Sequence, residues 1–344
     1  MNSTIKSSIT NPKLVTVNNE FTPSFGLRNP HIQTILSSIP PRKWQVLRGF
    51  SPYRRTQHEV ILDCGEDSRL QGFYNQAGAK RADKLLILIH GWEGSHESTY
   101  MLSAAQALLD KGVDVFRLNL RDHGATHHLN RGLFYSTLLE EVVTAIELIQ
   151  HQFAYQKYYL SGFSLGGNFA LRTAASSQNR ALELNKVIAF CPVIHAKECN
   201  EVLHDERNKI YNQYFVRRWK RSLLEKAKHW PEYPFVTQLE ALSDLNAMNH
   251  ALVPRYAGFD RVDDYFDAYA ISEAYLENTA VPCYLHFAHD DMVIPIEGVK
   301  RLAKNTNLDI SVTKYGGHCG FIKSWYGGNW QDERLIDLIC GDDS

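Results

Sequence analysis

The chain has 344 residues, of which 44% are hydrophobic and 22% are charged, proportions that are ordinary for soluble globular proteins. The composition therefore excludes a disordered or fibrous protein. Lys and Arg total 37 and Asp and Glu total 38, so the net charge of -1 gives no electrostatic reason to expect nucleic acid or an anionic membrane as a partner. We expect a small-molecule substrate instead.

No segment is apolar enough to span a membrane, because the longest aliphatic run, Leu85 to Ile89, is far below the ~20 residues that a transmembrane helix needs. The polar start, residues 1–13, lacks the apolar region of a signal peptide. The six cysteines are scattered without CxxC spacing, which predicts reduced thiols: Cys64, Cys191, Cys199, Cys283, Cys319 and Cys340. We therefore expect a cytoplasmic protein without a transmembrane segment.

The first part of the chain, residues 1–56, has no sustained hydrophobic period, and we expect it to wrap around a core formed later. It contains one short helical pattern, from Pro30 to Ser37. The segments from His58 to Leu62 and from Leu70 to Asn75 flank a turn-like DCGEDS sequence. This arrangement predicts an antiparallel hairpin.

From Lys84 onward, buried-strand patterns alternate with amphipathic helical patterns. The predicted strands cover residues 84–90, 113–120, 157–163, 186–192, 282–291 and 309–318. The predicted helices cover residues 100–112, 139–153 and 165–177. Strands that alternate with helices form parallel sheets wound on both faces, so we predict an α/β fold with a mostly parallel central sheet and helices on both faces.

Residues 194–279 interrupt this alternation with helical stretches rich in Trp, Tyr, Arg and Glu. Because ligands bind at the strand ends of open α/β sheets, we interpret this insertion as a helical cap, or lid, over those ends. The core then comprises residues 57–193 and 280–344. The alternative is that the inserted helices only enlarge the core.

A nucleophile motif lies between a predicted strand and a predicted helix. Residues 162–166, Gly-Phe-Ser-Leu-Gly, match the pattern in which a sharp strand-to-helix turn exposes a serine hydroxyl and glycines allow close backbone approach. The strand before it and the helix after it are the context that this motif requires. We therefore predict Ser164 as a catalytic nucleophile, and the alternative is an idle serine in a glycine-rich turn.

A serine nucleophile needs a base, and His318 is our candidate among 15 histidines because YGGHCGF follows the last predicted strand. The alternative for His318 is a turn residue with local hydrogen bonds. The base in turn needs a carboxylate, and Asp290 and Asp291 end the preceding strand. We prefer Asp291, which lies four residues before Pro295 as in many hydrolases with this motif. The adjacent Asp290 would then tie down the loop backbone.

Acyl transfer through a serine develops an oxyanion, which needs N–H donors. The candidates are the backbone amides of Leu165, directly after the nucleophile, and of Trp92, in the HGWEGS loop after the first central strand. This chemistry requires no cofactor, and no HExxH or paired-cysteine pattern indicates a metal site. We interpret Cys319, beside His318, as a small packing residue rather than a reactive thiol.

Several separate segments together resemble the YheT-like, embryogenesis-associated branch of the α/β-hydrolase superfamily. They are RNPHIQTIL, HGWEGS, GFSLGGN, the HDD loop and YGGHCGF, and they occur in the family's order over most of the chain from Phe21 to Phe321. The resemblance implies the α/β-hydrolase fold, with Ser164 as nucleophile, Asp291 as acid and His318 as base, in agreement with the motifs.

The chain departs from bacterial members of this branch at RDHGAT, where those proteins carry an arginine-glycine-cysteine loop. Substrate contacts near Asp122 and His123 therefore stay open. The NPHIQT segment is distinctive of the branch, and we expect it to pack against the core.

The resemblance implies a cytoplasmic or membrane-peripheral hydrolase of carboxylic esters, and eukaryotic relatives act on lipids. Together with the motifs, it predicts a serine esterase that cleaves a small-molecule ester, with a lipid-like ester as one candidate, through an acyl-enzyme on Ser164. The same residues would also serve an acyltransferase or a thioesterase. A catalytically silent, ligand-binding member of the fold is a further alternative.

Overall fold

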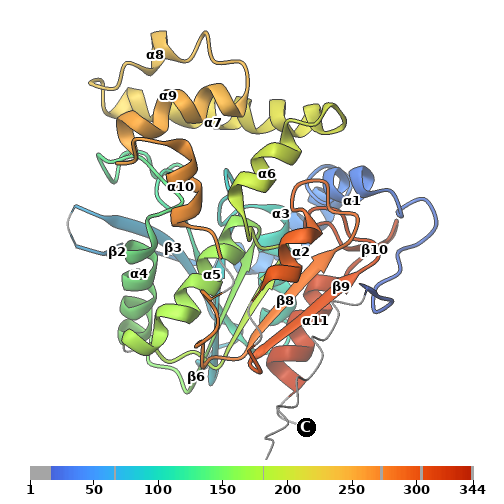
Figure 1. Ribbon diagram of the computed structural model, residues 1–344. Helices are drawn as coiled ribbons and strands as arrows, with labels where there is room; N and C mark the ends of the chain where they lie inside the picture. The colour runs from blue at the N-terminus through green and yellow to red at the C-terminus, as the bar shows by residue number, and fades with distance from the viewer. Residues whose placement is uncertain (1–16, 66, 181, 272–273, 303–304, 342–344) are drawn as a thin grey trace, which may run out of the picture.

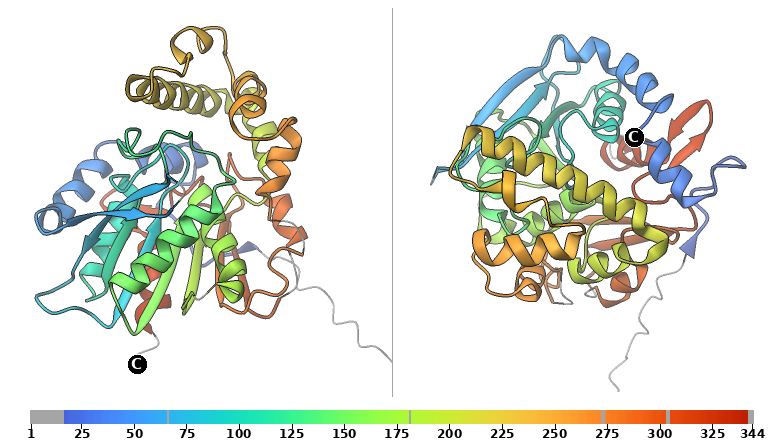
Figure 2. Two further views of the ribbon diagram at one scale, coloured as in Figure 1. Left: turned by 90° about the vertical axis from the view of Figure 1, so that its left-hand side faces the viewer. Right: turned by 90° about the horizontal axis from the view of Figure 1, so that it is seen from above.

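The computed structural model describes residues 17–344 except residues 66, 181, 272–273, 303–304 and 342–344. A large twisted sheet runs through the protein, with helices against both of its faces (Figure 1, Figure 2). Residues 1–16 lie outside the described residues. They include the polar start, in which we expect no signal peptide, and the beginning of the predicted N-terminal segment.

Within the described residues the central sheet has nine strands in the order β1-β9-β8-β7-β6-β4-β5-β3-β2. The strands are β1 (Val17–Asn18), β2 (His58–Asp63), β3 (Arg69–Asn75), β4 (Lys84–Ile89), β5 (Asp114–Leu118), β6 (Lys157–Phe163), β7 (Lys186–Phe190), β8 (Cys283–Ala288) and β9 (Leu308–Thr313). In this order, all neighbouring strands from β1 at one edge through to β5 pair in parallel. The last two strands, β3 and β2, are added in antiparallel pairing. Every residue of the central β4 is buried, as expected for a strand covered on both faces. The prediction of a mostly parallel sheet is confirmed.

Helices α2, α3 and α11 pack together on one face of the sheet, and α4 and α5 pack together on the other (Figure 1, Figure 2). The helices are α1 (Pro30–Leu36), α2 (Arg42–Arg54), α3 (Thr99–Leu109), α4 (Leu139–Gln152), α5 (Leu165–Ser176), α6 (Ala196–Leu203), α7 (Lys209–His229), α8 (Phe235–Gln238), α9 (Leu245–Tyr256), α10 (Val262–Ala268) and α11 (Trp330–Cys340). Short 3-10 helices cover Ser177–Asn179, Glu206–Asn208 and Ile296–Arg301, and β10 (Ile322–Ser324) pairs with β11 (Gly327–Asn329) in a separate hairpin.

The amphipathic pattern of α4 shows why the predicted helices form. Val142, Ile146 and Ile149, three or four residues apart, are buried against the core. On the outer side, Glu140 and Glu147 form ion pairs with the same arginine of a following loop. The apolar stripe therefore determines which face of the helix meets the sheet.

Several predicted strands end earlier in the structure, including 113–120 at Leu118 and 282–291 at Ala288, and for two others the backbone shows why. The prediction of a strand from 309 to 318 is wrong at its end, since β9 stops at Thr313 and Gly316 and Gly317 then take φ values of 152° and 55°. The prediction for 186–192 is two residues too long, because Cys191 has a φ of 44° and ends β7 at the residue before it. Both early ends form loops at the same edge of the sheet.

The hairpin and the short N-terminal helix are confirmed by β2, β3 and α1, but α2 is not predicted by the sequence pattern. Helix α2 contains Gly49 and Pro52, two residues that weaken helical patterns, and it buries little more than Val46 and Phe50. The helix is held by packing on α3 rather than by a clear amphipathic period.

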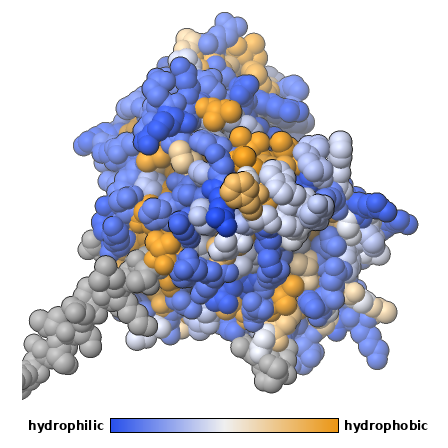
Figure 3. Space-filling view, turned by 90° about the vertical axis from the view of Figure 1, so that its right-hand side faces the viewer, coloured by the Kyte–Doolittle hydropathy of each residue, from blue (hydrophilic) through white to orange (hydrophobic). Residues whose placement is uncertain are grey.

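Helices α6 to α10 follow β7 and precede β8, and they stand above the edge of the sheet at which β6 and β7 end (Figure 1). Among the described residues, no helix is both long and apolar enough to cross a bilayer. Figure 3 shows a largely hydrophilic face on which apolar side chains gather in separate patches. Because helices α6 to α10 stand above this edge of the sheet, any site at the edge lies beneath them.

Candidate active site

Ser164 lies at the sharp turn between β6 and α5, with φ 54° and ψ -118°. Two glycines make this turn possible. A Cβ on Gly162 would lie 2.1 Å from the Gly166 carbonyl oxygen, and a Cβ on Gly166 would lie 2.3 Å from the Ile89 carbonyl oxygen. The strand, turn and helix that the motif requires are all observed, and the turn presents the serine at the edge of the sheet.

The three side chains predicted for the triad meet at this edge. His318 Nε2 lies 3.0 Å from Ser164 Oγ, and His318 Nδ1 lies 3.0 Å from Asp291 Oδ2. The second carboxylate oxygen of Asp291 accepts the N–H groups of Val293 at 2.8 Å and Ile294 at 3.0 Å. Since a carboxylate only accepts, Nδ1 donates to it, and in the neutral ring Nε2 is left to accept the serine hydroxyl proton.

The two neighbouring aspartates have different partners. Asp291 faces the imidazole, whereas Asp290 Oδ1 accepts the N–H of Gly317 at 2.9 Å and so holds the loop before His318. Burial raises the pKa of Asp290 to about 6. For His318, burial disfavours the charged imidazole, but the Asp291 carboxylate and the neighbouring Cys319 sulfur outweigh this effect and raise the pKa of His318 to about 9. The geometry thus agrees with our preference for Asp291 as the partner of the base.

The loop after β4 lies directly against the nucleophile turn. A Cβ on Gly91 would lie 3.2 Å from both the Ser164 Cβ and the Phe163 carbonyl oxygen. Within the described part of the chain, neither the N–H of Trp92 nor that of Leu165 donates to a protein acceptor. Both amides are therefore available to a ligand, as an oxyanion hole requires.

Two buried histidines, to which the sequence patterns assign no role, hold the shape of this loop. His123 Nε2 accepts the N–H of Glu93 at 3.0 Å. His90 Nδ1 donates to the Gly91 carbonyl oxygen at 2.8 Å, and His90 Nε2 accepts the N–H of Leu120 at 3.1 Å. Burial lowers the pKa of His90 to about 4 and that of His123 well below its usual value, so both rings are neutral. The RDHGAT loop therefore braces the loop after β4 through His123.

Helix α1, which carries the NPHIQT segment, braces the opposite side. Thr34 Oγ1 accepts the backbone N–H of His318 at 2.8 Å. The buried amide of Gln33 donates to the carbonyl oxygens of Leu27 and Ile322 at 2.7 and 3.0 Å and accepts the N–H of Ile322 at 2.7 Å. The segment does pack against the core, as expected, and it also holds the loop that carries the imidazole. No local pattern in this short, partly polar helix indicates that role.

Residues 80–318 match the model of the Hydrolase_4 family, which is described as serine aminopeptidase, S33. The chain belongs to the S33 family. The resemblance to YheT is confirmed by the Escherichia coli K12 protein YheT, which is 24% identical over 93% of each chain. The bovine phospholipase ABHD3 is 22% identical over 91% of this chain and 79% of its own length.

Among solved structures, the Pyrococcus furiosus esterase Pf2001 is similar, with a TM-score of 0.52 and 16% identity, over 82% of this chain and 90% of that one. This likeness shows the fold alone. Together with the S33 match and the central sheet, it confirms that this S33-family chain has the predicted α/β-hydrolase fold.

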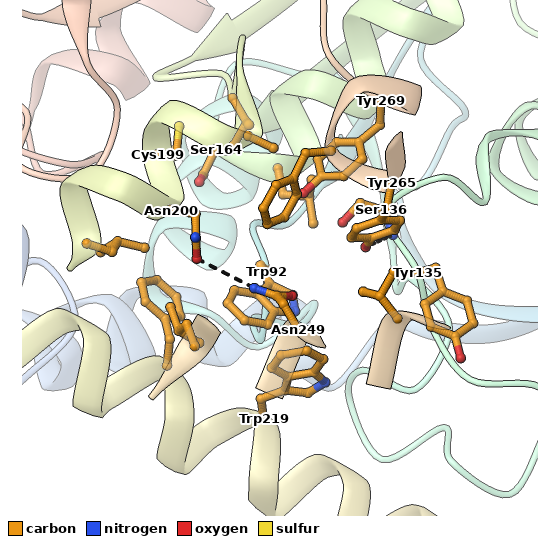
Figure 4. Close-up of a pocket in the computed structure, with 18 of the residues that line it drawn as sticks. Trp92, Tyr135, Ser136, Ser164, Cys199, Asn200, Trp219, Asn249, Tyr265 and Tyr269 are labelled. Atoms are coloured by element: carbon orange, nitrogen blue, oxygen red, sulfur yellow. Dashed lines mark hydrogen bonds between the residues drawn. The ribbon is translucent and has the colours of Figure 1, made fainter. Parts of the chain in front are cut away.

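In this S33-family protein a pocket of about 900 Å³, including its opening to solvent, extends from Ser164 between the sheet edge and helices α6, α7, α9 and α10 (Figure 4). Figure 4 shows Ser164 at the edge of a space framed by Trp92, Trp219 and Tyr269. Trp92 stacks on Phe215 of α7, with ring centroids 5.2 Å apart. No charged side chain lines the pocket among the residues that the structure describes. The pocket therefore favours uncharged, apolar groups.

A buried ion pair attaches α7 to the core of this family member. Lys226, which is 1% exposed, places Nζ 2.8 Å from Asp122 Oδ1. The same ammonium donates to the carbonyl oxygens of Asn130 at 2.6 Å and Gly132 at 2.9 Å. Asp122, whose contacts the sequence analysis left open, thus anchors a helix of the pocket wall.

Proposed function

We propose that the chain hydrolyses carboxylic esters through an acyl-enzyme on Ser164. The observation that carries this proposal is the continuous hydrogen-bonded chain from Ser164 Oγ through both nitrogens of His318 to Asp291. Such a chain lets the imidazole take the hydroxyl proton while the carboxylate stabilises the imidazolium.

The reaction has two steps. Ser164 Oγ attacks the ester carbonyl, His318 accepts the hydroxyl proton and then gives it to the departing alcohol. Water, activated by the same imidazole, then attacks the acyl-enzyme and releases the acid. The amides of Trp92 and Leu165 stabilise the oxyanion of each tetrahedral intermediate. These steps need no cofactor.

The apolar pocket favours a substrate with an uncharged, lipophilic acyl group, which the pocket would bind. Its walls are mostly aromatic and aliphatic, and Phe215, Trp219 and Leu252 come from helices α7 and α9. We propose that residues 194–279 act as a cap that shapes this wall, over a core of residues 57–193 and 280–344. The relation to a phospholipase, ABHD3, is consistent with lipid-like esters.

The family description also names an aminopeptidase, and the pocket argues against that activity here. An aminopeptidase has to bind a free ammonium group, which calls for a carboxylate in the pocket. The pocket wall, within the described residues, contains no Asp or Glu. We therefore expect p-nitrophenyl acyl esters to be cleaved and aminoacyl p-nitroanilides to remain intact.

The test replaces Ser164 with alanine and compares hydrolysis of p-nitrophenyl esters of increasing acyl length. Ser164→Ala should lower kcat by at least about 10⁴-fold. Ser161→Ala, on the same strand and away from the pocket, is the matched control and should keep its activity. A fluorophosphonate probe should label the wild type and not Ser164→Ala. Unchanged turnover by a folded Ser164→Ala variant would remove the serine from the mechanism.

A further inference from the structure

Two cysteine thiols lie beside the imidazole of His318. The Sγ atoms of Cys191 and Cys319 and one ring nitrogen of His318 all lie within 4.8 Å of one another. Both cysteines are reduced and buried, with exposed fractions of 0% and 6%. Three metal-ligating atoms therefore converge where the proposed base is located.

The backbone holds the two thiols in place. Cys191 and Cys319 both have positive φ values, 44° and 55°, which non-glycine residues rarely adopt. The N–H of Cys191 also donates to the carbonyl oxygen of His286 at 2.7 Å. The two thiols hydrogen-bond to each other. Their contacts to carbonyl oxygens are long, from Cys191 to the Gly317 oxygen at 3.9 Å and from Cys319 to the Phe190 oxygen at 3.6 Å. The donor atoms are thus preorganised, and little is lost when these weak contacts break.

We propose that a thiophilic divalent cation of the Zn²⁺ class binds Cys191, Cys319 and His318 and switches the hydrolase off. Two thiolates and one imidazole are a donor set that Zn²⁺ prefers, and a fourth position stays open for water. Each thiol loses its proton on binding. No other group of three His, Cys, Asp or Glu donors is this compact among the described residues.

The hydrogen bond between His318 and Asp291 fits this role as well. A metal-ligating histidine usually donates its other N–H to a carboxylate, and Nδ1 of His318 already lies 3.0 Å from Asp291. A cation on Nε2 leaves Asp291 its bond to Nδ1, whereas a cation on Nδ1 replaces that bond, and in either case the ring no longer serves Ser164. Ser164 then has no base. The inhibitory consequence rests on the proposed ester hydrolysis, whereas binding of the cation does not.

The test uses Co²⁺ as a spectroscopic substitute for Zn²⁺ on the purified full chain. We expect one equivalent of Co²⁺ to give a thiolate-to-cobalt charge-transfer band in the near ultraviolet, and Zn²⁺ to displace it. Cys319→Ser and Cys191→Ser should abolish the band and weaken Zn²⁺ binding by at least about tenfold. Cys283→Ser, a buried cysteine of β8, is the matched control and should keep the band. Since Cys191 is fully buried and its variant can fail to fold, Cys319→Ser carries the test alone if needed.

A second measurement concerns activity. Zn²⁺ should inhibit ester hydrolysis by the wild type, a chelator should restore it, and Cys319→Ser should need a higher Zn²⁺ concentration for the same inhibition. Absence of the band in folded wild type, or equal Zn²⁺ inhibition of the wild type and Cys319→Ser, overturns the proposal. Ser164→Ala should keep the band. A band without any ester hydrolysis by the wild type would support the metal site and overturn the proposed function instead.

Discussion

The edge of the sheet and the helices above it hold their side chains in different ways. At the edge, Ser164 sits in a turn that only glycines at 162 and 166 permit, and His318 is held through its ring and its backbone N–H. Above the edge, α6, α7, α9 and α10 contribute mostly aliphatic and aromatic side chains, and a buried ion pair between Lys226 and Asp122 links α7 to the core. The difference indicates that the backbone of the core positions Ser164 and His318, whereas the helices supply much of the apolar pocket wall.

The largest expected effect tests the edge. Asp291→Asn should lower kcat for ester hydrolysis by about 10⁴-fold, because an amide no longer stabilises the imidazolium and can favour the wrong tautomer. Asp290→Asn is the matched control, since an amide oxygen can still accept the N–H of Gly317, and it should lower kcat by less than about tenfold. Initial rates and circular dichroism of both variants give the answer. Equal losses for the two variants would remove the distinction between the aspartates.

The second prediction tests the attachment of the helices. Lys226→Met leaves the buried carboxylate of Asp122 without its partner and should lower the free energy of unfolding by about 3 kcal/mol. Urea unfolding followed by circular dichroism measures this change. Lys228→Met, at an exposed position on the same helix, should change the free energy by less than about 0.5 kcal/mol. The double variant Lys226→Met with Asp122→Leu should regain stability, and failure to do so would show that the ion pair is not the cause.

The sequence predicted those parts of the site that lie in short local patterns. Ser164, Asp291 and His318 each follow a strand that the hydrophobic pattern reveals, and parallel strands bring their ends to one edge. The nucleophile motif adds its own glycines. For these residues, local patterns and the order of the chain were sufficient to predict which side chains meet.

The remaining parts depend on contacts that no local pattern contains. Thr34 and His318 are 284 positions apart, and nothing near either one indicates their hydrogen bond. Lys226 lies on a helix rich in Lys and Arg, and only the fold distinguishes this buried lysine from exposed neighbours such as Arg221. Helix α2 was missed for a different reason, because Gly49 and Pro52 hide a helix that tertiary packing stabilises.

A third prediction uses the pH dependence of the edge. His318 has to be neutral to accept the serine proton, and its pKa is raised to about 9 in the folded protein. The base is therefore mostly protonated at neutral pH, and kcat/KM should rise by at least about tenfold from pH 7 to pH 9 before it levels off. Stopped assays corrected for spontaneous hydrolysis measure this profile, with the rate of fluorophosphonate labelling as an independent readout. A profile already flat at pH 7 would contradict the raised pKa.

The smallest expected effect concerns α1, which lies outside both the nucleophile turn and the helices above the sheet, but contacts the loop that carries His318. Thr34→Val keeps the shape of the side chain and removes the acceptor of the His318 N–H, at a cost of about 1 kcal/mol that corresponds to a roughly fivefold loss of kcat. KM should stay unchanged, because the substrate does not meet Thr34. Thr34→Ser should restore kcat, and Ser38→Ala, at an exposed position nearby, should have no effect. If Thr34→Val and Thr34→Ser behave alike, α1 only packs against the core, and the position of His318 is determined by Asp291 and the glycines of its loop.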